Sequence, residues 1–178
     1  YFVAREKDKS KDLKKKGFKA YVYEEEKRLA ALWSVALDDK DAKAQKLFST
    51  GHISSFDLSS KGDRIVVASA PTNLIDDYYM QRDLHVISSS SGEVESTVVI
   101  PGKLGSFHFS EDGKSIAILA GTDINDPSAG VLMLADTKSG ELTQLTKDAE
   151  QHIVDVDWLG KDILAVAHRG VESAIVLY

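Results

Sequence analysis

Serine is the first residue type to test for chemistry in this chain of 178 residues. A nucleophilic serine on a sharp strand-to-helix turn is framed by Gly-x-Ser-x-Gly, because small neighbours let its hydroxyl project. Gly113-Lys-Ser115 begins this pattern, but Ala117 stands in place of the second glycine and Ser115 begins a predicted strand. The sequence therefore predicts no nucleophilic serine of this type.

The histidines lack the spacing of a zinc site. A zinc site on one helix uses two histidines four residues apart, often with an adjacent glutamate. No pair has this spacing among the five histidines, which are His52, His85, His108, His152 and His168. His108 lies between Phe107 and Phe109, so alternation along a strand turns it away from their face. A strand-surface role is favoured over a ligand role.

Three charged clusters could bind ions, and each has a simpler interpretation. In a strand Asp76 and Asp77 would point to opposite faces and could not pair as acid and base. In a loop they could bind a cation, but a solvated or capping turn is favoured. Residues 123–126 resemble a calcium loop, but they lack its glycine at position six and its glutamate at position twelve. The basic run 14–16 is offset by the acidic run 24–26. No catalytic residue, metal ligand or cofactor is predicted.

The bulk composition is that of a globular domain, with 43% hydrophobic and 28% charged residues. A net charge of -6 argues against nucleic acid as a partner, since nucleic-acid binding needs a basic face. There is no cysteine, and no apolar run reaches the length of a membrane span. The first residues do not form a signal peptide, so we expect an internal start, and both a cytoplasmic and a periplasmic location remain open.

A phrase that recurs about every fifty residues organises the chain. It consists of a predicted short strand, a turn and the start of a second predicted strand. It occupies residues 53–65 and 104–116, and a more degenerate copy occupies residues 153–163. The turn Ser-Gly-Glu also recurs at 91–93 and 139–141. Repeats of this length built from short strands are typical of β-propellers.

The repeats predict an all-β chain, a β-propeller fragment of about three to four four-stranded antiparallel blades. We expect a single partial propeller domain over 1–178, divided into a partial blade (1–50, with a long charged insertion at 5–30), two blades (51–101 and 102–147) and a further partial blade (148–178). Propellers close as rings of typically four to eight blades. Open blade edges predict self-association, and a closed four-bladed ring is the alternative.

Two segments depart from the strand pattern. The insertion 5–30 is predicted to be irregular, with a short strand at 17–23, and residues 71–82 are predicted to be a loop. Long insertions of this kind often carry binding function. Trp33 and Trp158 fall within predicted strands and are expected to fill the layer between blades.

His52 and His152 occupy equivalent positions, because each directly precedes the first strand of its repeat. The first strand of a propeller blade lines the central channel. Both side chains could therefore lie at the channel mouth and contact an entering substrate. The simpler interpretation, a polar residue at a strand start, is favoured.

Several phrases resemble a known family. Leu74-Ile-Asp-Asp-Tyr-Tyr-Met80 followed by Asp83-Leu-His-Val86 resembles the N-terminal β-propellers of prolyl oligopeptidase family serine peptidases, in the acylaminoacyl-peptidase and dipeptidyl-peptidase-like branches. Val156–Leu159 with Arg169–Ser173 is similar to another segment there. Phe107–Lys114 is shared more widely with TolB-like propeller repeats.

The peptidase resemblance implies a non-catalytic role for this chain. In that family the propeller covers an α/β-hydrolase domain with a Ser-Asp-His triad and admits only peptides of limited size. This chain lacks the hydrolase domain, which would be its partner in the parent protein, and peptide substrate would reach it only through the parent. The alternatives are a TolB-like protein-interaction propeller without enzymatic activity and a propeller that binds a sugar or another ligand.

Overall fold

The computed structural model describes residues 1–5, 10–18, 20, 28–146 and 149–178. Within them, fourteen strands form four antiparallel sheets, called sheets A to D here in chain order. Sheet A contains β1 (Phe2–Arg5), β2 (Ala30–Ser34) and β3 (Gln45–Phe48). Sheet B contains β4 (His52–Leu58), β5 (Arg64–Ala70), β6 (Asp83–Ser88) and β7 (Val94–Val98).

The other two sheets repeat this order. Sheet C contains β8 (Leu104–Phe109), β9 (Ser115–Ala120), β10 (Val131–Asp136) and β11 (Leu142–Gln144). Sheet D contains β12 (His152–Leu159), β13 (Asp162–Arg169) and β14 (Glu172–Leu177). In each sheet, strands that follow one another in the chain are neighbours. This meander within each sheet, repeated along the chain, confirms the predicted propeller fragment.

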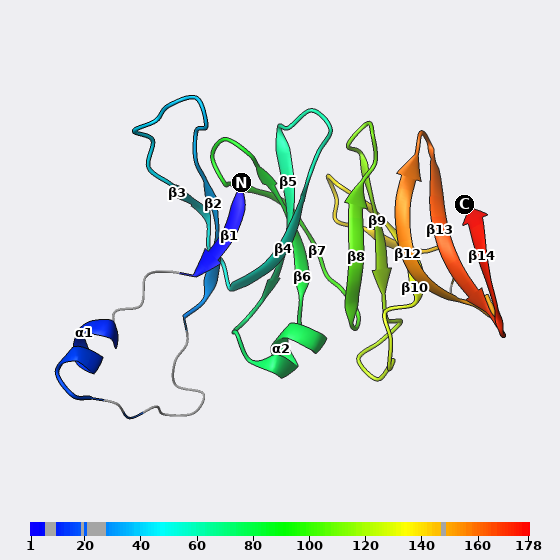
Figure 1. The fold of residues 1–178 in the computed structure, drawn as a ribbon. Helices are drawn as coiled ribbons and strands as arrows, with labels where there is room; N and C mark the ends of the chain where they lie inside the picture. Colours follow the sequence, from blue (N-terminus) through cyan, green and yellow to red (C-terminus); the bar gives the residue numbers. More distant parts are fainter. Residues whose placement is uncertain (6–9, 19, 21–27, 147–148) are drawn as a thin grey trace.

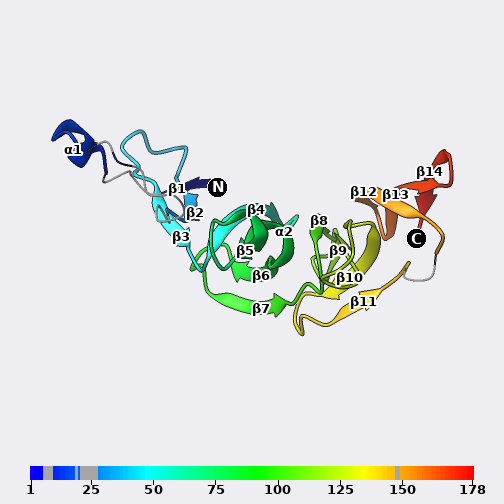
Figure 2. The ribbon, with the colours of Figure 1, turned by 90° about the horizontal axis from the view of Figure 1, so that it is seen from below.

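The sheets stand side by side along an arc (Figure 1). Seen from below, the first strands β4, β8 and β12 lie on its concave side, and the outer strands β7 and β11 lie on its convex side (Figure 2). Each sheet is therefore radial, as a propeller blade is. The first strands present a wall to the interior of the arc.

Apolar clusters between neighbouring sheets form the core. The cluster between sheets B and C includes Val66, Phe107 and Ile118, and the one between C and D includes Leu132 and Val156. The second strands β5 and β9 are buried on both faces because a sheet flanks each side, which explains their nearly continuous apolar sequences.

The repeated Ser-Gly-Glu turns hold adjacent blades together. Gly92 and Gly140 both have a left-handed backbone, with φ of 75° and 73°. A Cβ on Gly92 would overlap the Leu47 carbonyl oxygen of sheet A, and a Cβ on Gly140 would overlap the Thr97 carbonyl oxygen of sheet B. Only glycine meets both requirements, so the turn recurs because each blade rests its outer turn on the preceding blade.

Two predictions for the connections were wrong in part. The segment 71–82, predicted as a loop, contains helix α2 (Ile75–Met80). It has no Gly or Pro after Pro71, and Asp76 and Asp77 in the first turn are favourable to the helix dipole. The insertion 5–30, predicted as irregular, contains helix α1 (Ser10–Lys15). The predicted strand at 17–23 and the acidic run 24–26 lie largely or wholly outside the described residues.

The face of sheet D turned away from sheet C is apolar and uncovered. Val166, Ile175 and Leu177 are exposed there to 37%, 75% and 54%, whereas their neighbours Ala165 and Val176 pack toward sheet C. Self-association of the chain stays a prediction, and this face gives it a physical basis. No helix among the described residues is long and apolar enough to cross a membrane.

Candidate binding surfaces

His52 and His152 occupy the same place at two different blade junctions. Each begins the first strand of its sheet, His52 in register with Ala70 and His152 with His168. The Nδ1 atom of His52 accepts a hydrogen bond from the Ala30 N–H at 3.0 Å, at the start of β2 in sheet A. Burial, aided by the Arg5 charge, lowers the pKa of His52 below its ordinary value of 6.5.

His152 makes the corresponding contact with sheet C. A Cβ on Gly130, directly before β10, would overlap the His152 ring, and the Ile153 N–H donates to the Gly130 carbonyl at 2.9 Å. Both histidines thus pack against the backbone at the head of a neighbouring β-strand. Their predicted contact with a substrate stays a prediction. In the structure both side chains contact the neighbouring sheet.

Arg82 makes the contact at the junction between sheets B and C from the opposite side, because it precedes β6 as Gly130 precedes β10. It directly precedes β6, is 8% exposed, and donates to the Leu104 carbonyl oxygen from its guanidinium. The guanidinium lies 4.3 Å from the ring centroid of Tyr78 in α2, a cation–π contact. Sequence reasoning missed Arg82; the signal that could have found it is a charged residue placed directly before a buried strand.

An open cleft of about 450 Å³ lies beside Arg82, on the wall formed by β4 and β8. The Asp57 carboxylate accepts the Phe109 N–H at 2.9 Å and lies 3.9 Å from His108 Nδ1, so it bridges the two first strands. The cleft therefore carries a cation from Arg82, an anion from Asp57 and the aromatic ring of Tyr78. Such a mixed lining offers charge, hydrogen bonds and apolar surface to a ligand.

The other clusters singled out in the sequence serve local structure. The Asp77 carboxylate accepts the Thr72 hydroxyl at the start of α2. Asp126 accepts the N–H groups of Thr122 and Ser128, and these bonds lower its pKa. The residues that the structure describes include no group of three or more metal-ligating side chains.

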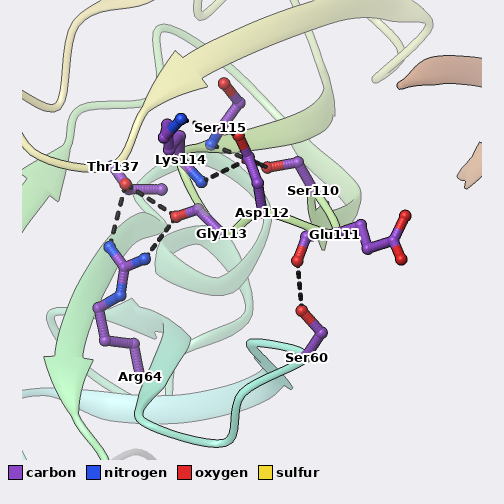
Figure 3. Close-up of polar contacts among 9 residues, drawn as sticks. All are labelled: Ser60, Arg64, Ser110, Glu111, Asp112, Gly113, Lys114, Ser115 and Thr137. Carbon is purple, nitrogen blue, oxygen red and sulfur yellow. Dashed lines mark hydrogen bonds and ion pairs between the residues drawn. The ribbon is translucent and has the colours of Figure 1, made fainter. Parts of the chain in front are cut away.

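Ser115, the nearest approach to a nucleophile in sequence, begins β9 directly after the turn from β8 (Figure 3). Its N–H donates to the Ser110 hydroxyl at 3.0 Å, and Ser110 also donates to Asp112 at 2.9 Å. Within the described residues, no hydrogen bond joins the Ser115 hydroxyl to a histidine. The hydrogen bonds found here hold together the turn between β8 and β9.

Arg64 ties this turn to sheet B (Figure 3). From the start of β5, its guanidinium donates to the Gly113 carbonyl at 2.6 Å and to the Thr137 hydroxyl at 3.1 Å. Thr137 donates to the same carbonyl at 3.1 Å, and the guanidinium carbon lies 5.9 Å from the ring centroid of Phe109. Charge-assisted bonds of this kind are among the stronger ones in proteins. Arg64 thereby closes one end of the junction between sheets B and C.

The corresponding end of the junction between sheets C and D is open. A cleft of about 440 Å³ lies there, and its walls include Glu111, Ser115, Leu134, Trp158 and Lys161. The Trp158 ring is held in place, because its indole N–H donates to the His108 carbonyl at 2.9 Å. This cleft is the second candidate binding surface.

Comparison with known proteins supports the fold. No protein-family model and no curated protein matches the sequence. Among solved structures, TolB from Acinetobacter baumannii is similar with a TM-score of 0.56 and 19% identity, over 84% of this chain and 35% of that one. The β-propeller domain of Myceliophteria thermophila Cps50 (Swd1) has a TM-score of 0.53 and 15% identity, over 79% of this chain and 43% of that one. The chain spans less than half the length of either, and at these identities the likeness shows the β-propeller fold alone.

Proposed function

We propose that this chain is a non-catalytic propeller segment of a prolyl oligopeptidase family serine peptidase, where it helps to gate the access of peptides to a separate hydrolase domain. The observation that carries the proposal is the segment 74–86, which resembles that family and forms α2 and the start of β6. In the structure this segment supplies Tyr78 and Arg82 to the cleft on the concave wall. This position supports the proposal, because a gate would meet its substrate on the concave wall.

The described side chains support a role without chemistry of its own. Ser115 begins β9, His52 and His152 pack against neighbouring strands, and His85 is held between the hydroxyls of Ser69 and Thr97 at 2.9 and 3.0 Å. Burial lowers the pKa of His85 below its ordinary value, because it disfavours the charged form of the ring. A hydrolytic nucleophile needs a base within hydrogen-bond reach. The Ser69 and Thr97 hydroxyls have His85 within reach, but both residues belong to paired strands of sheet B.

Gating follows from the position of the first strands. They form the concave side of the arc (Figure 2), and their polar side chains, including Ser55, Asp57, Ser106 and His108, line the cleft there. A peptide passing along this wall would meet hydrogen-bonding groups and alternating charges. His52 and His152 begin two of these strands, which is the basis for proposing them as contacts at the channel mouth.

A protein-interaction propeller of the TolB type is the second candidate. Its support is the phrase Phe107–Lys114, which is common in such repeats, and it needs no hydrolase domain. In that case the same concave wall would bind a folded partner, and no peptidase would be encoded with it.

The first test is the reading frame of the parent protein downstream of Tyr178. Gly-x-Ser-x-Gly followed by Asp and His in hydrolase order supports the gate. A stop codon after a few further blades overturns it in favour of the interaction propeller.

The second test asks whether the wall selects substrates by size. His108→Trp in the parent peptidase should lower kcat/KM for peptides of twenty residues several-fold more than for a dipeptide amide. Lys138→Trp, on an exposed turn of sheet C, is the matched control and should change neither. If His108→Trp lowers kcat/KM equally for the long and the short substrate, gating by this wall is contradicted.

A further inference from the structure

The junctions B/C and C/D can be compared residue by residue. Arg64 is in register with the last residue of β6, and Ser115 is in register with the last residue of β10. Phe109 and Trp158 also correspond, because each is in register with the first buried isoleucine of the next strand, Ile116 or Ile163. Arg64 lies over the Phe109 ring at junction B/C. Ser115 and Trp158 hold the equivalent register positions at junction C/D, and both line its cleft.

Junction C/D keeps the aromatic wall and lacks the arginine. A serine side chain is too short to cross to the next sheet as Arg64 does. The facing turn is also shorter, since four residues separate Trp158 from Ile163, whereas six separate Phe109 from Ile116. Together these two changes open the cleft of about 440 Å³. The volume lies where an arginine side chain lies at the preceding junction.

The lining suits a cation. Tryptophan is the aromatic ring that attracts cations most strongly, and its orientation is fixed by the bond to His108. The Glu111 carboxylate reaches no hydrogen-bond or ion-pair partner among the described residues, and in Figure 3 it points away from the turn network. Asp112 is engaged by Lys114 at 3.3 Å. Lys161, also at the cleft, is the one cation of the lining and weakens the attraction.

We propose that this cleft binds an arginine side chain of a polypeptide partner, with the guanidinium over Trp158 and against the Glu111 carboxylate. The bound arginine takes the place that Arg64 takes at junction B/C. The site is independent of the peptidase proposal, because it is built from the contacts of sheets C and D alone. Its partner is recognised by one basic side chain in an accessible segment.

Nuclear magnetic resonance of the full chain tests the site directly, because the two tryptophan indole N–H signals are separate reporters. Acetyl-Gly-Arg-Gly-amide should shift the Trp158 signal saturably, with a Kd in the millimolar range, and leave the Trp33 signal of sheet A in place. Acetyl-Gly-citrulline-Gly-amide has nearly the same shape without the charge, and should give less than a fifth of the shift at equal concentration.

Three variants sharpen the result. Ser115→Arg supplies the missing side chain from within and should abolish the peptide-induced shift. Glu111→Gln should weaken binding about two- to fivefold, and Lys161→Gln should tighten it by a similar factor, as expected for single exposed charges. Glu111 and Lys161 are both exposed, so these variants should fold normally.

The peptide titration distinguishes the proposed site from non-specific binding. A Trp158 shift that needs the positive charge and disappears in Ser115→Arg supports the site. Equal shifts with the arginine and citrulline peptides, equal shifts of both tryptophans, or no shift at 50 mM peptide overturns it.

Discussion

The two junctions of sheet C share one strand register but differ in side chains and in the length of one turn. Between sheets B and C, Arg64 reaches the Gly113 carbonyl and the Thr137 hydroxyl and closes the junction. Between sheets C and D, Ser115 stands in the place of Arg64 and a cleft remains. Both junctions bury an apolar cluster. The comparison indicates that the apolar layer holds the blades together at both junctions. The polar end of a junction can be closed by a side chain or left as a cleft.

The largest effect should come from the turn that rests on sheet B. Gly140→Ala places a Cβ against the Thr97 carbonyl oxygen in a left-handed backbone, so it should cost more than about 3 kcal/mol of unfolding free energy, since the backbone strain alone is about 1–3 kcal/mol. Gly160→Ala is the matched control at junction C/D, with φ of 64° and no atom within 4 Å of the added Cβ. Urea denaturation measures both, and equal losses would contradict the role of the outer turn.

Removing the arginine seal should have a smaller effect. Arg64→Leu keeps apolar volume but loses two charge-assisted hydrogen bonds, so the free energy of unfolding should fall by about 1.5–3 kcal/mol. Ser115→Ala at the open junction should change it by less than about 0.5 kcal/mol. If thermal unfolding shows the two variants to be equally stable, Arg64 does not seal the junction.

Trp158→Phe makes the open junction resemble the closed one in its aromatic ring. It removes the indole hydrogen bond to the His108 carbonyl and should cost about 1 kcal/mol, the usual net value of such a bond. Phe109→Leu at junction B/C removes ring volume from a residue that is 7% exposed. Chemical denaturation of the two variants compares the loss of a hydrogen bond with the loss of apolar packing. An unchanged stability of Trp158→Phe would show that the indole hydrogen bond does not stabilise the junction.

The smallest effect should be the dependence of stability on pH. Burial lowers the pKa of His52 and of His85 below 6.5 in the folded chain, so the unfolded chain binds more protons between the folded pKa values and 6.5. Their contribution to stability is complete above pH 6.5 and is lost as the pH falls through that window. The melting temperature should therefore be lower at pH 5 than at pH 7.5, and His85→Gln should reduce the difference. A melting temperature that rises on acidification would contradict these directions.

The sequence predicted the strands well because the blade repeat is dense in local information. The phrases at 53–65 and 104–116 coincide with β4 and the start of β5, and with β8 and the start of β9. Helix α2 was missed, since six residues are too few for a helical period to be seen against a loop. The contacts of Arg64 and Arg82 were also missed, because they join residues 49 and 22 positions apart and depend on how blades stack.

The candidate surfaces show the same division. Serine and histidine spacing excluded known catalytic patterns, and the structure adds what each side chain contacts. The cleft at junction C/D has no motif of its own. It exists because a serine replaces an arginine at one of two equivalent positions and because the facing turn is two residues shorter. Both changes become visible only when the sheets are compared by register.

The most direct test of the functional proposal is labelling of the parent protein with a fluorophosphonate probe, followed by mapping of the modified serine by mass spectrometry. We predict one stoichiometrically labelled serine, located beyond Tyr178, and none within residues 1–178. Labelling of Ser115 or any other serine of this chain would contradict the account, and so would a parent protein that the probe leaves unmodified.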